Sequence, residues 1–235
     1  LTHMYKASVL LGHIPEAWSK ARVIFIPKAG KTDYKEPRSF RPITLSSVLI
    51  KTLERVVLWH MNETFLTTSP LSHFQNAFRQ GRSTDTALSQ MVTYIEEAKT
   101  KNEYALGVFL DIQGAFDNVR TASIIAGMRA KGIEDMFVTW YQHYLTHRTV
   151  EVEHIGVKLE RNLTRGTPQG GVISPLAWNL VFEGLLEPIQ RTKVKIIGFA
   201  DDAGLIVSGP HPRLRAEHMQ EAIDLALGWG TRNGL

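Results

Sequence analysis

The sequence has 235 residues, of which 43% are hydrophobic and 21% are charged, so it can bury one sizeable core and is not intrinsically disordered. The formal net charge of +4 and the sequence pI of about 9.3 permit a nucleic-acid partner without requiring one. Binding of nucleic acid depends on where Lys and Arg cluster and not on the net charge alone. The lack of cysteine excludes disulfides, cysteine-based zinc sites and thiol nucleophiles, so carboxylates must hold any metal.

The ends of the sequence suggest an excerpt of a longer protein. The chain begins at Leu1 without an initiator methionine or a signal sequence, and an apolar-periodic helix containing Met219 and Trp229 runs almost to Leu235. No apolar stretch approaches the roughly 20 residues that a membrane-spanning helix needs, so no membrane partner is expected.

The predicted elements begin with a strand, a basic loop and a helix. Ala21–Ile26 alternates in hydrophobicity and is rich in β-branched residues, and Pro27 ends it. After the basic loop, apolar residues from Ser46 to Met61 recur at helical spacing. Ser83 is the predicted N-cap of a second helix, which precedes the strand that Asp111 closes.

The remaining periodic segments complete a mixed pattern. They are predicted helices near Thr121–Lys131, Asp135–Thr146 and Val172–Glu187, a hairpin of Thr149–Val152 and Val157–Leu163 around Gly156, and a strand pair, Lys193–Phe199 and Ala203–Ser208. Because strands and helices do not alternate regularly, the sequence predicts an α+β fold with an antiparallel sheet packed on helices.

Three carboxylates follow two of the predicted strands. Asp111 closes the apolar run that begins at Ala105, and Asp201 and Asp202 follow the run that ends at Ala200. Gathered together, these carboxylates would repel one another unless divalent cations neutralised them, and paired Mg²⁺ ions are the usual arrangement for phosphoryl transfer. Since adjacent strand residues point to opposite faces, we rank Asp201 above Asp202. The pattern favours a nucleotide polymerase, whereas each aspartate alone would be an ordinary solvated strand end or turn residue.

Two further motifs fit a nucleotide site. Phe116 follows Asp111 closely, and its ring could lie under an incoming sugar, where a 2′-hydroxyl would collide with it. Gln169 lies in a loop rich in Gly and Pro, Arg165–Pro175, which would let a polymer backbone approach closely. The alternatives are a core aromatic for Phe116 and an ordinary helix-entry turn for the loop.

Basic residues accompany both regions. Lys28 and Arg41 are candidates for binding a triphosphate, and Arg79 and Arg82 are candidates for contacting template phosphates. The alternative in each case is a solvated surface loop.

In order along the chain, these motifs resemble the reverse transcriptase family, and within it LINE-type non-LTR retrotransposons. The segments that carry the resemblance are Ile26-Pro27-Lys28, Phe40–Ile43, Ala77–Ser83, Leu110-Asp111 with Phe116-Asp117, Gly166–Gly171 and Phe199–Asp202. Six motifs in order are far more specific than any one of them. The family more often has Tyr where Phe199 stands.

The resemblance implies a right-hand polymerase with a palm sheet and fingers, and the thumb is expected to lie beyond this piece. Residues 1–105 are expected to form mainly fingers, 106–120 palm, 121–165 a connection between fingers and palm, and 166–235 palm. Asp111, Asp201 and Asp202 match the catalytic, metal-binding aspartates. Phe116 matches the sugar-gate aromatic, and Gln169 matches the glutamine near the nucleotide. Lys28 and Arg41 look like the cations of the fingers.

The resemblance also implies RNA-directed DNA polymerisation in retrotransposition. The partners would be an RNA template, a DNA primer and dNTPs, the cofactors two Mg²⁺ ions with Mn²⁺ as a substitute, and the location the nucleus in a eukaryotic host. The alternatives are a catalytically silent nucleic-acid-binding module and an RNA-dependent RNA polymerase, against which an aromatic at Phe116 argues.

Overall fold

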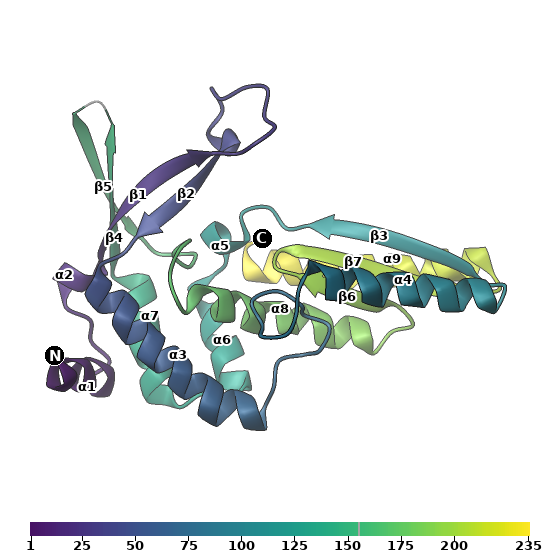
Figure 1. Cartoon of the computed structure of the whole chain (residues 1–235), viewed down its shortest axis with the longest axis horizontal. Coiled ribbons are helices and arrows are strands. Elements are labelled where there is room, and N and C mark those ends of the chain that lie inside the picture. Colours follow the sequence, from purple (N-terminus) through teal and green to yellow (C-terminus); the bar gives the residue numbers. More distant parts are fainter. Residues whose placement is uncertain (155) are drawn as a thin grey trace. The chain divides into compact units, whose positions relative to one another are not determined.

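The computed structural model describes residues 1–154 and 156–235, which divide into two compact units. Unit 1 consists of Leu1–Ser69 and Phe116–Ser174, and unit 2 of Pro70–Ala115 and Pro175–Leu235. Each unit combines helices with a sheet of its own (Figure 1), which confirms the predicted mixed fold. No helix in the described ranges is long and apolar enough to cross a membrane.

Unit 1 contains a four-stranded sheet in the order β2-β1-β4-β5. Its elements, placed by where most of each lies, are α1 (Thr2–Leu10), α2 (Glu16–Ser19), β1 (Lys20–Pro27), η1 (Pro37–Ser39), β2 (Phe40–Leu45), α3 (Val48–Thr68), α5 (Ala115–Asn118), α6 (Thr121–Ala130), α7 (Asp135–Thr146), β4 (Arg148–His154) and β5 (Val157–Leu163). β1 pairs antiparallel with β2 and parallel with β4. The sequence did not reveal β2 because Pro42 interrupts it, and an edge strand tolerates the missing N–H.

Helix α7 carries the largest side chains of the unit 1 core. Phe137, Trp140, Tyr141 and Tyr144 recur at helical spacing and are all buried. The ring of Phe137 also contacts aromatic rings of α3. This apolar stripe is why α7 begins and ends where the sequence predicted.

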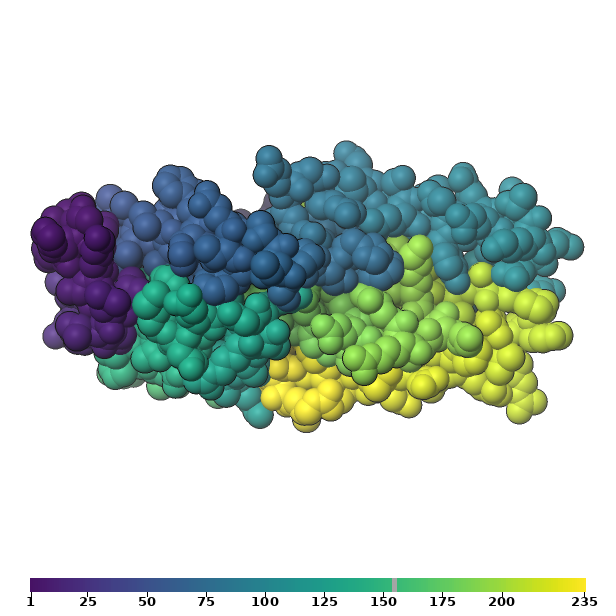
Figure 2. Space-filling view, turned by 90° about the horizontal axis from the view of Figure 1, so that it is seen from below, coloured from purple at the N-terminus to yellow at the C-terminus, as the bar shows by residue number. Residues whose placement is uncertain are grey.

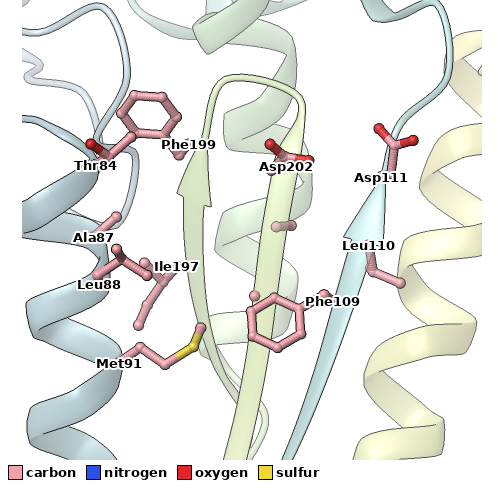
Figure 3. Close-up of a pocket in the computed structure, with 12 residues that line it drawn as sticks. Thr84, Ala87, Leu88, Met91, Phe109, Leu110, Asp111, Ile197, Phe199 and Asp202 are labelled. Carbon is pink, nitrogen blue, oxygen red and sulfur yellow. The ribbon is translucent and has the colours of Figure 1, made fainter. Parts of the chain in front are cut away.

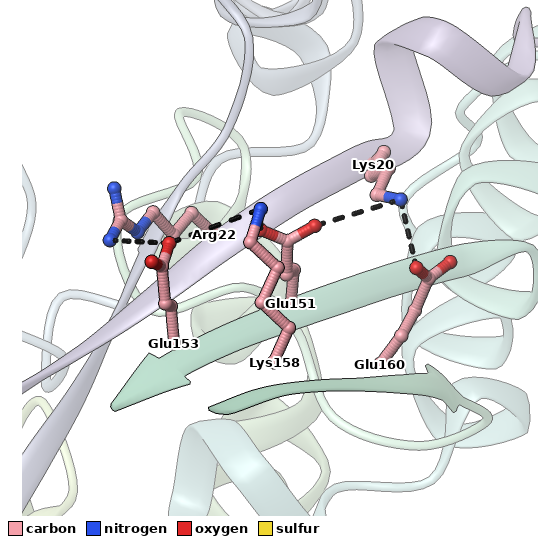
Figure 4. A network of polar contacts seen from close by, with 6 residues as sticks. All are labelled: Lys20, Arg22, Glu151, Glu153, Lys158 and Glu160. Carbon is pink, nitrogen blue, oxygen red and sulfur yellow. Dashed lines mark hydrogen bonds and ion pairs between the residues drawn. The ribbon is translucent and has the colours of Figure 1, made fainter. Parts of the chain in front are cut away.

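A chain of ion pairs joins β1, β4 and β5 at the surface (Figure 4). It links Glu160, Lys20, Glu151, Lys158, Glu153 and Arg22 in that order, with charges of alternating sign. The shortest contact, between Lys20 Nζ and Glu160 Oε2, is 2.8 Å, and both side chains are about half exposed. Exposed pairs of this kind contribute about 1 kcal/mol or less each, so the network adds little stability.

Unit 2 is built on the antiparallel sheet β3-β7-β6. Its elements are α4 (Thr84–Thr100), β3 (Tyr104–Asp111), α8 (Ser174–Gln190), β6 (Lys195–Phe199), β7 (Asp202–Gly209) and α9 (Pro212–Asn233). Gly204 lies against Met91 of α4, whereas Gly198 lies on the other face, where an added Cβ would be 2.5 Å from Phe182 Cε1 of α8. Small residues on both faces therefore let helices approach the sheet closely (Figure 1).

Helices α8 and α9 pack against each other through Trp229. Its ring contacts Trp178 and Phe182, and its Nε1 donates a hydrogen bond to the carbonyl of Val181 at 3.3 Å. Figure 2 shows the surface of α9 in yellow beside the green surface of α8. The last helix is thus part of the unit 2 core.

Candidate functional site

Asp111 and Asp202 lie opposite each other at the ends of neighbouring strands. Asp111 ends β3, Asp202 begins β7, and the two are direct partners in the antiparallel register. Partners in such a register share one face of the sheet, and here it is the face that carries Gly204 and is covered by α4. Both carboxylates therefore emerge at the same end and on the same face (Figure 3).

These two aspartates border a mainly apolar pocket of about 360 Å³ in unit 2. Its other lining residues are Thr84, Ala87, Leu88, Met91, Phe109, Leu110, Ile197, Phe199, Ala203 and Gly204. Both aspartates are exposed, so their charges stay in contact with solvent at the rim while the apolar side chains line the interior.

Asp201 lies in the turn between β6 and β7 and does not line this pocket. The turn is held in place by its backbone: the carbonyl of Asp201 accepts a hydrogen bond from the N–H of Ile112 at 3.3 Å. The carbonyl of Ala200, a residue with φ of 56°, accepts another from Trp178 Nε1 at 2.7 Å. The register thus brings Asp202 beside Asp111 and places Asp201 at the turn.

The donor set suits a hard divalent cation. Within residues 1–154 and 156–235, no three His, Cys, Asp or Glu side chains form a group that could hold a metal ion. Asp111 and Asp202 nevertheless supply the oxygen ligands that such ions prefer, and Mg²⁺ commonly takes only one or two carboxylates, with water and substrate phosphates completing its shell. The two aspartates therefore fit a metal that is shared with a phosphate substrate.

In unit 1, the loop that carries Gln169 is joined to β2. The carbonyl of Gln169 accepts a hydrogen bond from the N–H of Thr44 at 2.7 Å. The side-chain Oε1 of Gln169 is buried and accepts no hydrogen bond from the part of the chain that the structure describes. A buried acceptor without a donor costs free energy, so this atom is suited to a ligand that can donate.

The same loop is bonded to the segment of Phe116. Thr167 donates its N–H to the carbonyl of Phe116 at 2.7 Å, and Gly166 donates to the carbonyl of Val119 at 2.8 Å. Two backbone hydrogen bonds therefore connect the segment of Phe116, the predicted sugar-gate aromatic, to the loop of Gln169, the predicted nucleotide-binding glutamine.

Two buried polar side chains, Arg148 and Glu54, bind the backbone of this loop. Neither of them was identified as a site residue from the sequence. Arg148, which is 3% exposed, donates hydrogen bonds to the carbonyls of Arg165 at 3.0 Å and Gly166 at 2.9 Å. Glu54, which is 0% exposed, accepts from the N–H groups that lead into α8. The sequence did contain a signal for Glu54: it is a charged residue within the buried face of α3, next to Leu53 and at helical spacing from Ile50.

Burial raises the pKa of Glu54 to about 7, although hydrogen bonds from Val172 and Ile173 and the charges of Lys51 and Arg148 lower it. Burial likewise raises the pKa of Tyr141, whose hydroxyl lies 2.9 Å from Thr167 Oγ1. The carboxyl group of Glu54 is therefore the one in this cluster that changes charge near neutral pH.

This raised pKa predicts a pH-dependent stability. The folded chain holds the Glu54 proton more tightly than the unfolded chain, so the stabilisation is complete below pH 4.5 and is lost as the pH rises through about 7. Relative to Glu54→Gln, the free energy of unfolding of the wild-type chain should fall by about 3 kcal/mol across that range. Urea unfolding at a series of pH values measures this difference. Glu63→Gln, an exposed change on the same helix that keeps Glu54, should lose stability across this range as the wild-type chain does.

The predicted triphosphate-binding cations lie along the β1–β2 hairpin. The backbone N–H of Lys28 donates to the carbonyl of Ser39 at 2.8 Å, and Arg41 lies opposite Ile26 and is exposed. Burial raises the pKa of Asp117, and the charges of Arg148 and Lys28 partly oppose that rise. Lys28 is thus close enough to influence the residue that follows Phe116.

The predicted template-binding arginines make contacts inside unit 2. Arg79 donates through its guanidinium to the carbonyls of Ser72 and, at 3.0 Å, Gln75, and burial lowers its pKa. Arg82 lies 3.5 Å from Asn76 Oδ1. The guanidinium of Arg79 therefore stabilises the loop that precedes α4.

Comparisons with known proteins agree with the architecture of both units. The family model described as reverse transcriptase (RNA-dependent DNA polymerase) matches residues 26–235. The Pol polyprotein of the type-1 retrotransposable element R1 of Bradysia coprophila is 30% identical over 230 residues, which cover 97% of this chain and 22% of that protein. The RNA-directed DNA polymerase of the mobile element jockey of Drosophila melanogaster is 28% identical, with 97% and 25% covered. The chain thus spans about a quarter of these relatives.

Solved structures show the same fold at low sequence identity. Apo telomerase of Candida tropicalis truncated from its C-terminal domain superposes with a TM-score of 0.62 at 13% identity, covering 90% of this chain and 47% of that one. Telomerase of Candida albicans in complex with a fragment of telomeric RNA gives a TM-score of 0.60 at 11% identity, covering 97% and 44%.

Proposed function

The chain belongs to the reverse transcriptase (RNA-dependent DNA polymerase) family, and on that basis we propose that it carries out RNA-directed DNA polymerisation in retrotransposition. The single observation that carries the proposal is the register that sets Asp111 of β3 against Asp202 of β7 within a chain of this family. The reaction would be in-line attack of a primer 3′-hydroxyl on the α-phosphate of a dNTP, with pyrophosphate leaving.

Reverse transcriptases generally use divalent metal ions. We propose Mg²⁺, with Mn²⁺ as a substitute, held by Asp111 together with Asp201 and Asp202. The bound ions would lower the pKa of the primer hydroxyl and neutralise charge on the leaving phosphates. The alternation of side chains along the predicted strand ranked Asp201 first, whereas the strand register supports Asp202 as the partner of Asp111.

The residues of unit 1 are proposed to bind the nucleotide. The Oε1 of Gln169 has no hydrogen-bond partner among the described residues, which supports a role in accepting a hydrogen bond from the sugar or base, and Lys28 and Arg41 are proposed to bind the triphosphate. We propose an RNA template and a DNA primer as the polymeric partners, with Arg82 and Arg79 near the template. We also propose that residues 1–105 form mainly fingers, 106–120 and 166–235 palm, and 121–165 the connection between fingers and palm.

Primer extension tests the proposal. A DNA primer annealed to an RNA template should be extended with dNTPs, in the presence of Mg²⁺ and not of EDTA, and only poorly with NTPs. Extension that prefers NTPs would identify an RNA-dependent RNA polymerase instead. Binding of primer and template without extension, also in a C-terminally longer chain, would favour a silent nucleic-acid-binding module.

Phe116→Ala is expected to relax the preference for dNTPs over NTPs by about tenfold or more, because the ring would no longer collide with a 2′-hydroxyl. The ratio of kcat/KM for dGTP and GTP measures this preference. Phe25→Ala removes an exposed ring of β1 in the same unit and should leave the ratio unchanged. An unchanged ratio in Phe116→Ala would remove the sugar-gate assignment.

A further inference from the structure

A buried carboxylate lies beneath the loop that carries Gln169. Each oxygen of Glu54 accepts one backbone hydrogen bond: Oε2 from Val172 at 3.3 Å and Oε1 from Ile173 at 3.4 Å. A buried charge of this kind destabilises a fold relative to a well-packed apolar residue, so packing alone does not explain a carboxylate at this position. We therefore expect the role of Glu54 to lie in the two backbone N–H groups that its oxygens bind.

The loop is bound at both of its ends and at its middle. Arg148 holds the carbonyls of Arg165 and Gly166 at the start of the loop, and Glu54 holds the N–H groups at its end. Between them, the carbonyl of Gln169 is bonded to the N–H of Thr44. The backbone on either side of Gln169 thus depends on an anion and a cation that are both buried.

We propose that Glu54 is a positioning residue that orders this loop so that Gln169 meets the incoming nucleotide, an inference that rests on the proposed function. Only the ionised carboxylate offers an acceptor to both N–H groups without competition. Protonation turns one oxygen into a donor, and Glu54→Gln places an NH₂ group against one of the two N–H groups. Either change releases one end of the loop.

The charge state of Glu54 depends on its neighbours from three elements. Lys51 lies on α3 itself, Arg148 comes from β4, and Tyr141 and Tyr144 come from α7. Because burial brings the pKa of Glu54 to about 7, the loop should be held more firmly in slightly alkaline solution than in slightly acidic solution. The same ionisation lowers global stability, so loop order and fold stability oppose each other here.

The equilibrium affinity for the next dNTP tests the inference without turnover. With a dideoxy-terminated primer on an RNA template at about pH 8, Glu54→Gln should weaken dNTP binding about tenfold, which corresponds to the loss of one hydrogen bond, whose N–H group would then face the NH₂ group. Glu63→Gln on the exposed face of α3 should bind as the wild type does. In the wild type, affinity should rise from about pH 6 to about pH 8, and in Glu54→Gln it should not.

A double-mutant cycle separates positioning from general damage. Gln169→Ala should also weaken dNTP binding, and adding Glu54→Gln to it should weaken binding little further, because Glu54 acts through Gln169. Equal and additive losses would overturn the inference. So would an unchanged affinity in Glu54→Gln.

A spectroscopic readout on the wild-type chain needs no activity. The amide proton shifts of Val172 and Ile173 in the wild-type chain should titrate together with a midpoint near the pKa of Glu54, about 7, and should be flat in Glu54→Gln. Absence of this titration would contradict the inference even if Glu54→Gln failed to fold. A wild-type chain that bound dNTP but extended no primer would contradict only the proposed function, and the affinities would still decide the role of Glu54.

Discussion

Asp111→Asn should reduce kcat for primer extension by at least about 10³-fold, equivalent to about 4 kcal/mol of transition-state stabilisation. The substitution keeps the size of the side chain and removes the charge that a divalent ion requires. Because Asp111 is exposed at the end of β3, the free energy of unfolding should change by no more than about 0.5 kcal/mol. Single-turnover extension at saturating dNTP measures the loss.

The same substitution at the other two aspartates tests whether both of them act with Asp111. Asp201→Asn and Asp202→Asn should each cost at least about 10²-fold in kcat. Asp224→Asn on the exposed face of α9 is the matched control and should extend primers as the wild type does. If Asp111→Asn kept a tenth of the wild-type rate, the metal-binding assignment would be wrong.

Gly166→Ala is expected to destabilise unit 1 strongly. Gly166 has a φ of +75°, and an added Cβ would lie 2.5 Å from the carbonyl oxygen of Asp117 and 2.7 Å from that of Phe116. Both are backbone atoms that cannot rotate away, so the loop must move or the fold must loosen. We expect a loss of about 3 to 5 kcal/mol in the free energy of unfolding, measured in urea.

Gly132→Ala separates the collision from the backbone strain. Gly132 has nearly the same φ, +74°, but among the described residues no atom beyond its chain neighbours lies within 4 Å of an added Cβ. It should therefore cost only the strain of a left-handed residue, about 1 kcal/mol. Equal losses at the two positions would mean that the close approach of the loop to Phe116 does not matter for stability.

Local sequence patterns determined most of the elements. The predicted helix near Asp135–Thr146 is α7 over the same residues, and Ser83 does cap α4, with Thr86 completing the capping box. Both features depend on residues within one or two helical turns, so the chain encodes them without its tertiary partners. The prediction of a helix from Val172 was two residues early, because α8 begins at Ser174.

The order of the motifs also sufficed to indicate the family, which the match over residues 26–235 confirms. It did not suffice to rank Asp201 against Asp202, because the alternation rule needs the position where β7 begins. The structure begins β7 at Asp202 and pairs it with Asp111. That register depends on hydrogen bonds between segments far apart in the sequence.

Only the tertiary structure decided the roles of Glu54 and Arg148. Glu54 lies 118 residues before Val172, and no periodicity of the sequence links the two. Hydrogen bonds join α3 and β4 to the Gln169 loop. They form only when packing removes water from the side chains and the loop backbone, so that these polar groups must bond to one another. The sequence by itself therefore determined the helices, strands and motifs, which follow from local periodicity and composition. The support beneath the candidate nucleotide site was decided by long-range burial, which no local pattern encodes.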